Sequence, residues 1–406
     1  MVKNIVIVND FANTDGGAGK VAVDVALELS KQYNVFFFTS VKPIDVRFVN
    51  SHVRIICVGK PDILSDTNRI RAITKGLFDS NVRKQFKSLL SNLDSKDTIV
   101  HVHTWTKALT SAIFEVTSKM NFHLVLTLHD YFIACPNGGF FNYKAKRICD
   151  RKSLSVNCLL SNCDVRNYPQ KLWRVLRLLI QKHFLWRNKK LTLLYISDMC
   201  RNMSLPYIPN NVDMIYLPDP VELGNKAKVD VSTNECYLYL GRLSPEKGAI
   251  LFCEAISDLR LKGLIVGDGY LKKELEVKYP HIEFAGWASG KKKELCLRRA
   301  KALVFPSFLG ETYGLVVAEA KSYGIPCIVP DRCAASEQIE DGKTGYIFKT
   351  GDLESLKQAI MKFENTNLVK MQKNLIDSFN PNDLSMETHL KRLVNIYNEI
   401  LGNDEK

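Results

Sequence analysis

The chain has 406 residues, of which 46% are hydrophobic and 24% are charged, and this composition is typical of a folded globular protein with two or three domains. No run of about 18 apolar residues occurs, which excludes a conventional membrane-spanning helix. The N-terminal segment lacks the long apolar run and the cleavage site of a signal peptide, so a cytoplasmic protein with reduced cysteines is expected.

The first half of the chain alternates strand-like and helix-like stretches. Apolar runs that predict strands occur at 4–8, 35–39, 53–58, 98–103, 123–128 and 191–197. Helical patterns lie between them, at about 20–31, 82–90 and 108–120. Strands that alternate with helices predict a parallel sheet covered on both faces. Residues 1–205 are therefore expected to form a Rossmann-like domain.

A glycine-rich loop, residues 14–20 (TDGGAGK), follows the first predicted strand. A P-loop would need Gly at position 14 and Ser or Thr after the lysine, where this chain has Thr14 and Val21, so a P-loop is excluded. What remains is a turn at Gly16 and Gly17 between a strand and a helix, where the backbone can approach a ligand closely.

Two predicted strands end in histidine, at residues 101–103 (HVH) and at His129. Ligand sites in parallel sheets form at the carboxyl ends of the strands. A single histidine is also commonly a hydrogen-bonded structural residue, and the pattern alone leaves both roles open.

Four cysteines, Cys135, Cys149, Cys158 and Cys163, fall within an expected insert at about 135–165. They could hold a structural zinc ion, although only the last pair approaches ligand spacing and the paired CxxC motifs of zinc sites are missing. Free thiols in an inserted loop are the alternative.

Positive charge is concentrated in residues 151–201, which carry eleven Lys or Arg against two Asp. Within this region, residues 171–190 form a basic helical pattern with Trp173, Phe184 and Trp186 and no acid. Such a helix could lie on an anionic bilayer, with its aromatic residues in the interface, or pack on the core with a solvated basic face. No nucleic-acid motif accompanies the charge, so nucleic acid is not an expected partner.

Four prolines in residues 206–221 disfavour a helix and indicate a linker. A second alternating set follows in residues 222–380, which are expected to form another Rossmann-like domain. The final part, 381–406, contains an amphipathic helical pattern.

Two turns in the second half carry charged residues. The first places Arg242 and Lys247 five residues apart after an apolar strand, where they could hold a diphosphate from two sides. The second, after Pro306, opens a helix whose first free amides favour an anion. Glu311 and Glu319 bracket this helix start and could accept hydrogen bonds from hydroxyls. A nucleotide-sugar fits such a site, while two solvated surface acids are the simpler alternative.

The turn GR…EKG, followed about 60 residues later by G-E-x7-E, resembles glycosyltransferase family 4, the retaining enzymes of glycosyltransferases group 1. This resemblance implies an α/β fold of the GT-B class, in which two Rossmann-like domains face each other across a cleft. It further implies a hexosyltransferase-type enzyme that moves a sugar from a nucleoside-diphosphate sugar to a glycan or lipid-linked acceptor. Such enzymes act in bacterial capsule, O-antigen or exopolysaccharide biosynthesis, and a peripheral position at the inner face of the cell membrane would suit them.

The resemblance also suggests roles for individual residues. The expected catalytic residues are His129, Arg242, Lys247 and Glu311, with His103 a weaker candidate on the acceptor side. The expected donor-binding residues are Gly16, Gly17, Gly241, Gly267, Gly269, Gly314, Leu315 and Glu319. No Asp-x-Asp motif is present, so neither a catalytic metal nor a cofactor is expected.

Three further expectations remain open. Glu337 also matches the family pattern, although an acid at a helix start explains it as well. In similar proteins the last helix crosses back to the N-terminal domain, which is expected here for 381–406. A sugar-nucleotide epimerase and a basic binding protein with a degenerate pocket are the alternative functions, and the sugar, base and acceptor are not determined by the sequence.

Overall fold

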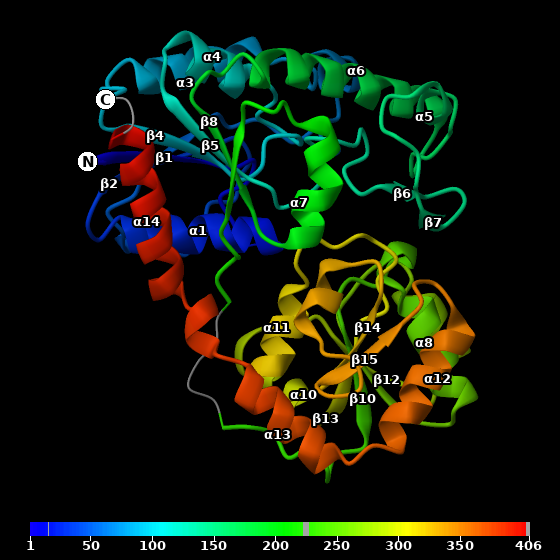
Figure 1. The fold of residues 1–406 in the computed structure, drawn as a ribbon. Coiled ribbons are helices and arrows are strands. Elements are labelled where there is room, and N and C mark those ends of the chain that lie inside the picture. The colour runs from blue at the N-terminus through cyan, green and yellow to red at the C-terminus, as the bar shows by residue number, and fades with distance from the viewer. Residues whose placement is uncertain (15, 222–226, 403–406) are drawn as a thin grey trace.

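The computed structural model describes residues 1–14, 16–221 and 227–402. It contains two parallel sheets with helices on both faces, stacked one above the other in Figure 1. The first sheet has seven strands in the order β3-β2-β1-β4-β5-β8-β9, and the second has six in the order β12-β11-β10-β13-β14-β15. The predicted arrangement of two Rossmann-like domains is confirmed.

The N-terminal domain is built on buried apolar strands. Its main strands are β1 (Asn4–Val8), β2 (Asn34–Thr39), β3 (Arg54–Cys57), β4 (Thr98–Val102), β5 (His123–Thr127), β8 (Leu191–Tyr195) and β9 (Asp213–Tyr216). Its helices are α1 (Gly17–Leu29), α2 (Arg69–Lys75), α3 (Ser80–Leu90), α4 (Ala112–Lys119), α5 (Val156–Leu159), α6 (Tyr168–Leu185) and α7 (Asp198–Ser204). Alternate side chains of β1 enter two different cores, Val6 with α3 and α4, and Ile5 with α1. Both faces of the sheet are therefore covered.

The C-terminal domain repeats this architecture. Its strands are β10 (Cys236–Leu240), β11 (Lys262–Val266), β12 (Glu283–Gly286), β13 (Ala300–Val304), β14 (Cys327–Pro330) and β15 (Gly345–Phe348). Its helices are α8 (Ala249–Asp258), α9 (Lys272–Lys278), α10 (Gly290–Arg298), α11 (Leu315–Ser322), α12 (Leu353–Glu364) and α13 (Leu368–Ser378). Tyr237 and Leu238 of β10 point into the two opposite cores.

The predicted linker 206–221 requires a correction, because part of it is a strand. β9 pairs in parallel with β8, with Thr192 opposite Asp213. The four prolines of this segment lie on either side of β9, so the amides of Asp213–Tyr216 remain free to join the sheet. The N-terminal sheet therefore extends past residue 205 to Tyr216. Residues 222–226, where the C-terminal domain was predicted to begin, lie outside the described residues.

The last helix, α14 (Met386–Gly402), packs on the N-terminal domain beside α1 (Figure 1). The Val2 amide donates to Oδ1 of Asn398 at 2.9 Å, and the Tyr397 hydroxyl lies 2.6 Å from Nδ1 of His101. Leu393 and Ile396 enter the same core as α1. The chain therefore crosses between the domains twice, and both described ends lie on the N-terminal domain.

Candidate active site

The turn that carries Arg242 and Lys247 packs closely against the residues that follow β13. Gly248 has a φ of 72°, and a Cβ atom there would lie 1.9 Å from the carbonyl oxygen of Pro306. Only glycine permits this close approach. As a result the Lys247 ammonium forms an ion pair with Glu311, whose Oε1 also accepts a hydrogen bond of 2.9 Å from the Ser307 hydroxyl. Two motifs more than 60 residues apart in the chain thus meet at one point.

Arg242 stands at the exposed end of the same turn. Its carbonyl accepts a hydrogen bond of 2.7 Å from the Tyr239 hydroxyl, which fixes the backbone. Among the described residues, no carboxylate pairs with its guanidinium, so this cation is available to an anionic ligand.

The predicted pocket glycines pack two loops together. A Cβ atom at Gly267 would lie 1.9 Å from the Gly241 carbonyl oxygen, and one at Gly269 would lie 2.4 Å from the Leu243 carbonyl oxygen. The loop after β11 can therefore lie directly against the loop that carries Arg242. This packing accounts for both glycines without assigning them a ligand contact.

The start of α11 faces the glycine turn of the other domain. Gly314 has a φ of 87°, and α11 begins at Leu315 with no side chain capping its first amides. A Cβ atom at Gly17 would lie 2.9 Å from Cδ1 of Leu315. Gly16, with a φ of 95°, comes just before it. The two glycine turns thus lie opposite each other between the domains, next to helix amides that favour an anion.

His129 is buried at the end of β5, in a hydrogen-bond network rather than free in solvent. Its Nε2 lies 2.9 Å from Nδ1 of His103, and its Nδ1 lies 3.2 Å from Oδ2 of Asp219. The Thr312 hydroxyl of the C-terminal domain donates to the His129 carbonyl at 2.8 Å. Burial lowers the pKa of His129, but the charge of Asp219, its hydrogen bond and the nearby Asp130 outweigh burial and raise that pKa.

Asp219 and Thr312 were not among the residues predicted from the sequence. Asp219 lies between Pro218 and Pro220 in the supposed linker, and its contact with His129 spans 90 positions, so no local pattern indicates it. Thr312 directly follows Glu311 in the sequence, and this position next to a predicted site residue could have indicated that Thr312 is part of the site.

We expect Asp219→Asn to lower the free energy of unfolding more at about pH 5.5 than at about pH 8.5. A raised histidine pKa adds stability that is fully present below the unfolded value of about 6.5 and is lost as the pH rises through the folded value. The asparagine removes the charge that raises the pKa of His129. Urea denaturation of both proteins across this range measures the difference, and equal losses at both ends would contradict a charged His129–Asp219 pair.

Glu319 lies on α11, four residues after Leu315, the first residue of that helix. Its Oε1 forms an ion pair of 2.7 Å with Lys293 of α10, and its side chain is only 12% exposed. Its predicted role in holding a ribose stays a prediction.

Glu337 lies at the domain interface. Its carboxylate accepts the amides of Asp198 at 3.1 Å and Met199 at 2.5 Å, which open α7 of the N-terminal domain. It therefore caps a helix of the opposite domain. Burial raises the pKa of Glu337.

The predicted zinc site at Cys135, Cys149, Cys158 and Cys163 is not formed. Across the described ranges, no three His, Cys, Asp or Glu side chains are arranged to hold a metal ion. Asn137 lies between two of the cysteines, accepting from the Cys135 thiol at 2.9 Å and placing its amide 3.7 Å from the Cys163 sulfur. Burial raises the pKa of Cys135 to about 11, which favours the thiol over the thiolate that zinc requires.

Comparison with known proteins gives consistent results. Residues 225–378 match the family described as glycosyl transferases group 1. The chain is 27% identical over 194 residues to a phosphatidyl-myo-inositol mannosyltransferase of Mycobacterium leprae, covering 43% of this chain and 50% of that protein. It is 26% identical over 200 residues to an Escherichia coli UDP-Gal:alpha-D-GlcNAc-diphosphoundecaprenol alpha-1,3-galactosyltransferase, covering 44% and 51%. The matches thus span about half the length of these relatives.

Solved structures match over nearly the whole chain. Anabaena Alr3699/HepE in complex with UDP gives a TM-score of 0.67 at 13% identity and covers 98% of this chain and 100% of that one. The sucrose-phosphate synthase of Thermosynechococcus elongatus gives 0.71 at 16% identity and covers 99% and 100%. These likenesses confirm the predicted GT-B fold.

Proposed function

We propose that this chain, whose residues 225–378 match the glycosyl transferases of group 1, transfers a hexose from a nucleoside-diphosphate sugar to a glycan or lipid-linked acceptor, with retention of configuration. The observation that carries the proposal is the meeting of Lys247 with Glu311 just before α11. The cation and the carboxylate meet where the two turns pack together, and α11 begins four residues after Glu311, an arrangement that suits a sugar joined to a diphosphate.

The proposed chemistry depends on charge that develops at the diphosphate. As the sugar leaves, negative charge grows on the β-phosphate, and fixed cations stabilise it most when it is largest. Lys247 and the unpaired Arg242 supply this charge, together with the first amides of α11. Glu311 and Ser307 hold Lys247 in place before the donor binds, and in the complex Glu311 accepts hydroxyls of the donor sugar. The proposal requires neither a metal ion nor a cofactor for these steps.

His129 belongs to the acceptor side in this proposal. It lies at the end of β5 and contacts the C-terminal domain through Thr312, which directly follows Glu311. The acceptor would enter from the N-terminal domain, past Gly17 and His129.

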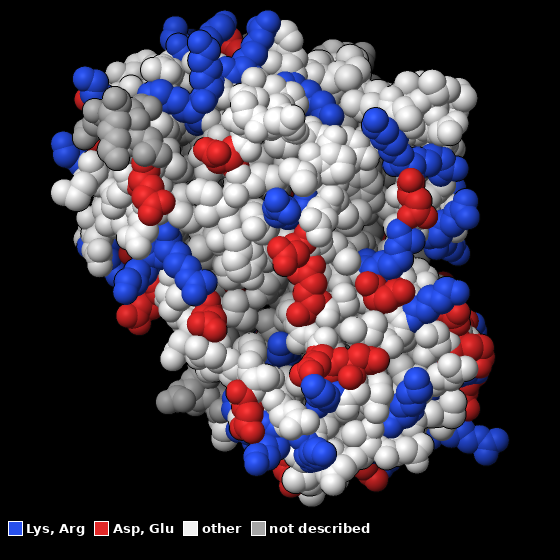
Figure 2. All heavy atoms as spheres, in the orientation of Figure 1, with Lys and Arg blue, Asp and Glu red and all other residues white. Residues whose placement is uncertain are grey.

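We place the enzyme at the inner face of a membrane in bacterial surface polysaccharide assembly. The names of two relatives include lipid acceptors, phosphatidyl-myo-inositol and a diphosphoundecaprenol-linked sugar. No helix within the described ranges has the length and apolar content to cross a bilayer. Contact would be peripheral, through residues 171–190, and Figure 2 shows Lys and Arg along the upper edge of the N-terminal domain.

The structure changes which side chains of α6 could make that contact. The Trp173 indole donates to the Ile73 carbonyl at 3.0 Å, and Phe184 and Trp186 pack against the core, so the aromatic residues are partly covered. The large hydrophobic side chains that α6 exposes are instead Leu172, Leu176 and Leu179. Their spacing places them on one face of the helix.

Calorimetry with UDP, GDP and ADP, followed by an assay of the corresponding sugars for hydrolysis and transfer, tests the function. We expect one nucleotide to bind and its sugar to be transferred. An epimerised free nucleotide-sugar without transfer, or no nucleotide binding, would contradict the proposal.

A further inference from the structure

A cavity of about 420 Å³ lies on the N-terminal domain between α2 and α6, away from the Lys247 turn. Its lining contains five cations and no acid. The five cations are Arg69, Lys107, Arg166, Arg174 and Arg177. We propose that this cavity binds the phosphate-bearing head of a lipid-linked acceptor, whose apolar chain then follows α6.

Arg177 is the central observation, because its guanidinium is buried and forms no direct ion pair with a carboxylate of the described residues. The side chain is 9% exposed, and its Nη1 donates to the Thr106 carbonyl at 2.9 Å. The guanidinium lies over the rings of Phe132 and Trp173, 5.0 Å and 5.4 Å from their centroids. No carboxylate in the described part of the chain forms an ion pair with it. The carboxylates of Asp10, Asp130 and Asp164 act on this charge from a distance, and the cavity offers space for an anion that pairs with it directly.

The other cations of the cavity are also largely uncommitted. Arg69 donates only to the backbone carbonyls of Ile63 and Asp66, at 3.2 Å and 3.1 Å. Lys107 and Arg166 are exposed and have no carboxylate partner among the described residues. Arg174 alone is paired, with Asp164 at 2.9 Å. A phosphate or diphosphate is complementary to this set, since guanidinium groups bind phosphate oxygens through paired hydrogen bonds.

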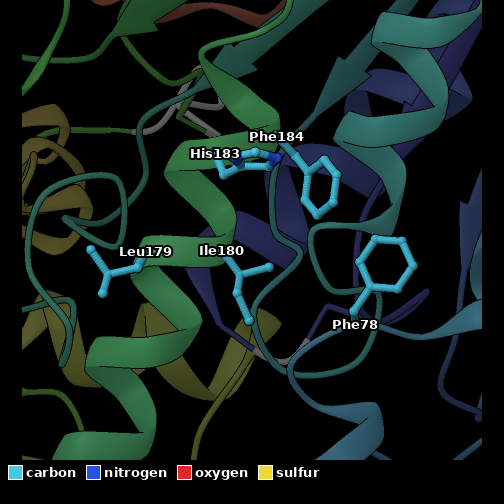
Figure 3. A pocket seen from close by; sticks show the side chains of 5 residues that line it. All are labelled: Phe78, Leu179, Ile180, His183 and Phe184. Atoms are coloured by element: carbon cyan, nitrogen blue, oxygen red, sulfur yellow. The ribbon is translucent and has the colours of Figure 1, made fainter.

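An apolar surface leads away from the cavity along α6. Leu172, Leu176 and Leu179 are 44–49% exposed and lie beside the helix face that carries Trp173 and Arg177. They lead to an open groove of about 530 Å³, shown in Figure 3, in which Ile180, His183 and Phe184 of α6 lie opposite Phe78. A hydrocarbon chain fits this surface, and a free phosphate would leave it uncovered.

The cavity shares its inner wall with the proposed acceptor side. Phe132 lies three residues after His129, and its amide donates to Asp130 at 2.9 Å. Lys107 lies in the loop that follows β4, the strand before His103. A head group held here is therefore next to the loops that carry both histidines. The assignment of the ligand as an acceptor rests on the proposed transferase function.

Calorimetric measurement of farnesyl diphosphate binding tests the cavity and does not depend on enzyme turnover. Farnesol lacks the phosphates and inorganic pyrophosphate lacks the chain, and we expect each to bind at least about tenfold more weakly. If pyrophosphate binds equally well, the cavity is a simple anion site. If farnesol binds equally well, only the apolar surface is used. Either result overturns the proposal.

Two variants locate the site. Arg177→Met and the exposed Arg166→Ala should each weaken farnesyl diphosphate binding about tenfold or more. Arg187→Ala is the matched control, since Arg187 is exposed just beyond α6 and outside the cavity, and it should bind as the unchanged protein does. Unchanged binding in both Arg177→Met and Arg166→Ala overturns the assignment.

Two further results separate the possible sources of the ligand. Phosphatidylglycerol vesicles that displace farnesyl diphosphate with the same dependence on Arg177 would show a site for the head groups of bulk bilayer phospholipid, which contradicts selective binding of a lipid-linked acceptor. Nucleotide binding is measured on the same samples. Arg177-dependent lipid binding without any nucleotide binding would remove the transferase function but leave the cavity as a lipid-phosphate site.

Discussion

Replacing Lys247 with alanine is expected to lower turnover by a factor of about one hundred or more, with the fold intact. In the proposed function, Lys247 places a positive charge where the diphosphate leaves, and that contact is strongest in the transition state. Within the ranges that the structure describes, Lys247 forms an ion pair with Glu311 alone, and both side chains are partly exposed, so the substitution leaves the core unchanged. Steady-state transfer measured with the donor identified by calorimetry gives the turnover.

Lys262→Ala is the control for this experiment. Lys262 lies in the same domain and pairs with Glu235, but its side chain is 67% exposed and takes no part in the site. Turnover should be unchanged there, while Arg242→Ala should resemble Lys247→Ala. Turnover near that of the unchanged protein in both Arg242→Ala and Lys247→Ala would contradict the assignment of the cation pair.

Gly248→Ala is expected to destabilise the C-terminal domain by about 3 kcal/mol or more. Two costs add together. The φ of 72° is unfavourable for alanine, which costs about 1 kcal/mol, and the new Cβ would lie 1.9 Å from the Pro306 carbonyl oxygen. Relieving that contact moves the turn of Lys247 away from β13, so turnover should fall as well. Urea unfolding followed by circular dichroism measures the stability.

Gly342→Ala separates the two costs. Gly342 has a φ of 75°, nearly the same as that of Gly248, but nothing lies within 4 Å of its Cβ position. We expect it to lose only about 1 kcal/mol and to keep its turnover. Equal losses of unfolding free energy in the two variants would mean that backbone strain alone acts at Gly248 and that the contact with Pro306 is relieved without a cost.

The sequence was sufficient to predict the two domains, because buried parallel strands are apolar runs and the helices between them carry a regular apolar period. The meeting of Lys247 and Glu311 could be anticipated only through the family resemblance. Nothing local to either residue indicates the pair, which depends on how closely Gly248 approaches Pro306.

Other features could not be predicted, for identifiable physical reasons. The strand β9 was not predicted because it has only four residues and prolines lie on both sides of it. The basic pattern of α6 suggested a solvated face, but the structure buries Lys171 and Arg177. The Lys171 ammonium binds the carbonyls of Cys158 and Ser161, so it belongs to the insert. Such partners come from distant segments, and a helical period does not show them.

The carboxylate of Glu337 has a consequence for how the two halves can move. It accepts hydrogen bonds from two amides of a helix that belongs to the other half, so it helps to hold the two halves together. Separation of the halves would release both amides to water and would also break the hydrogen bond from Thr312 to the His129 carbonyl. Opening between the halves therefore carries a free-energy cost to which residue 337 contributes.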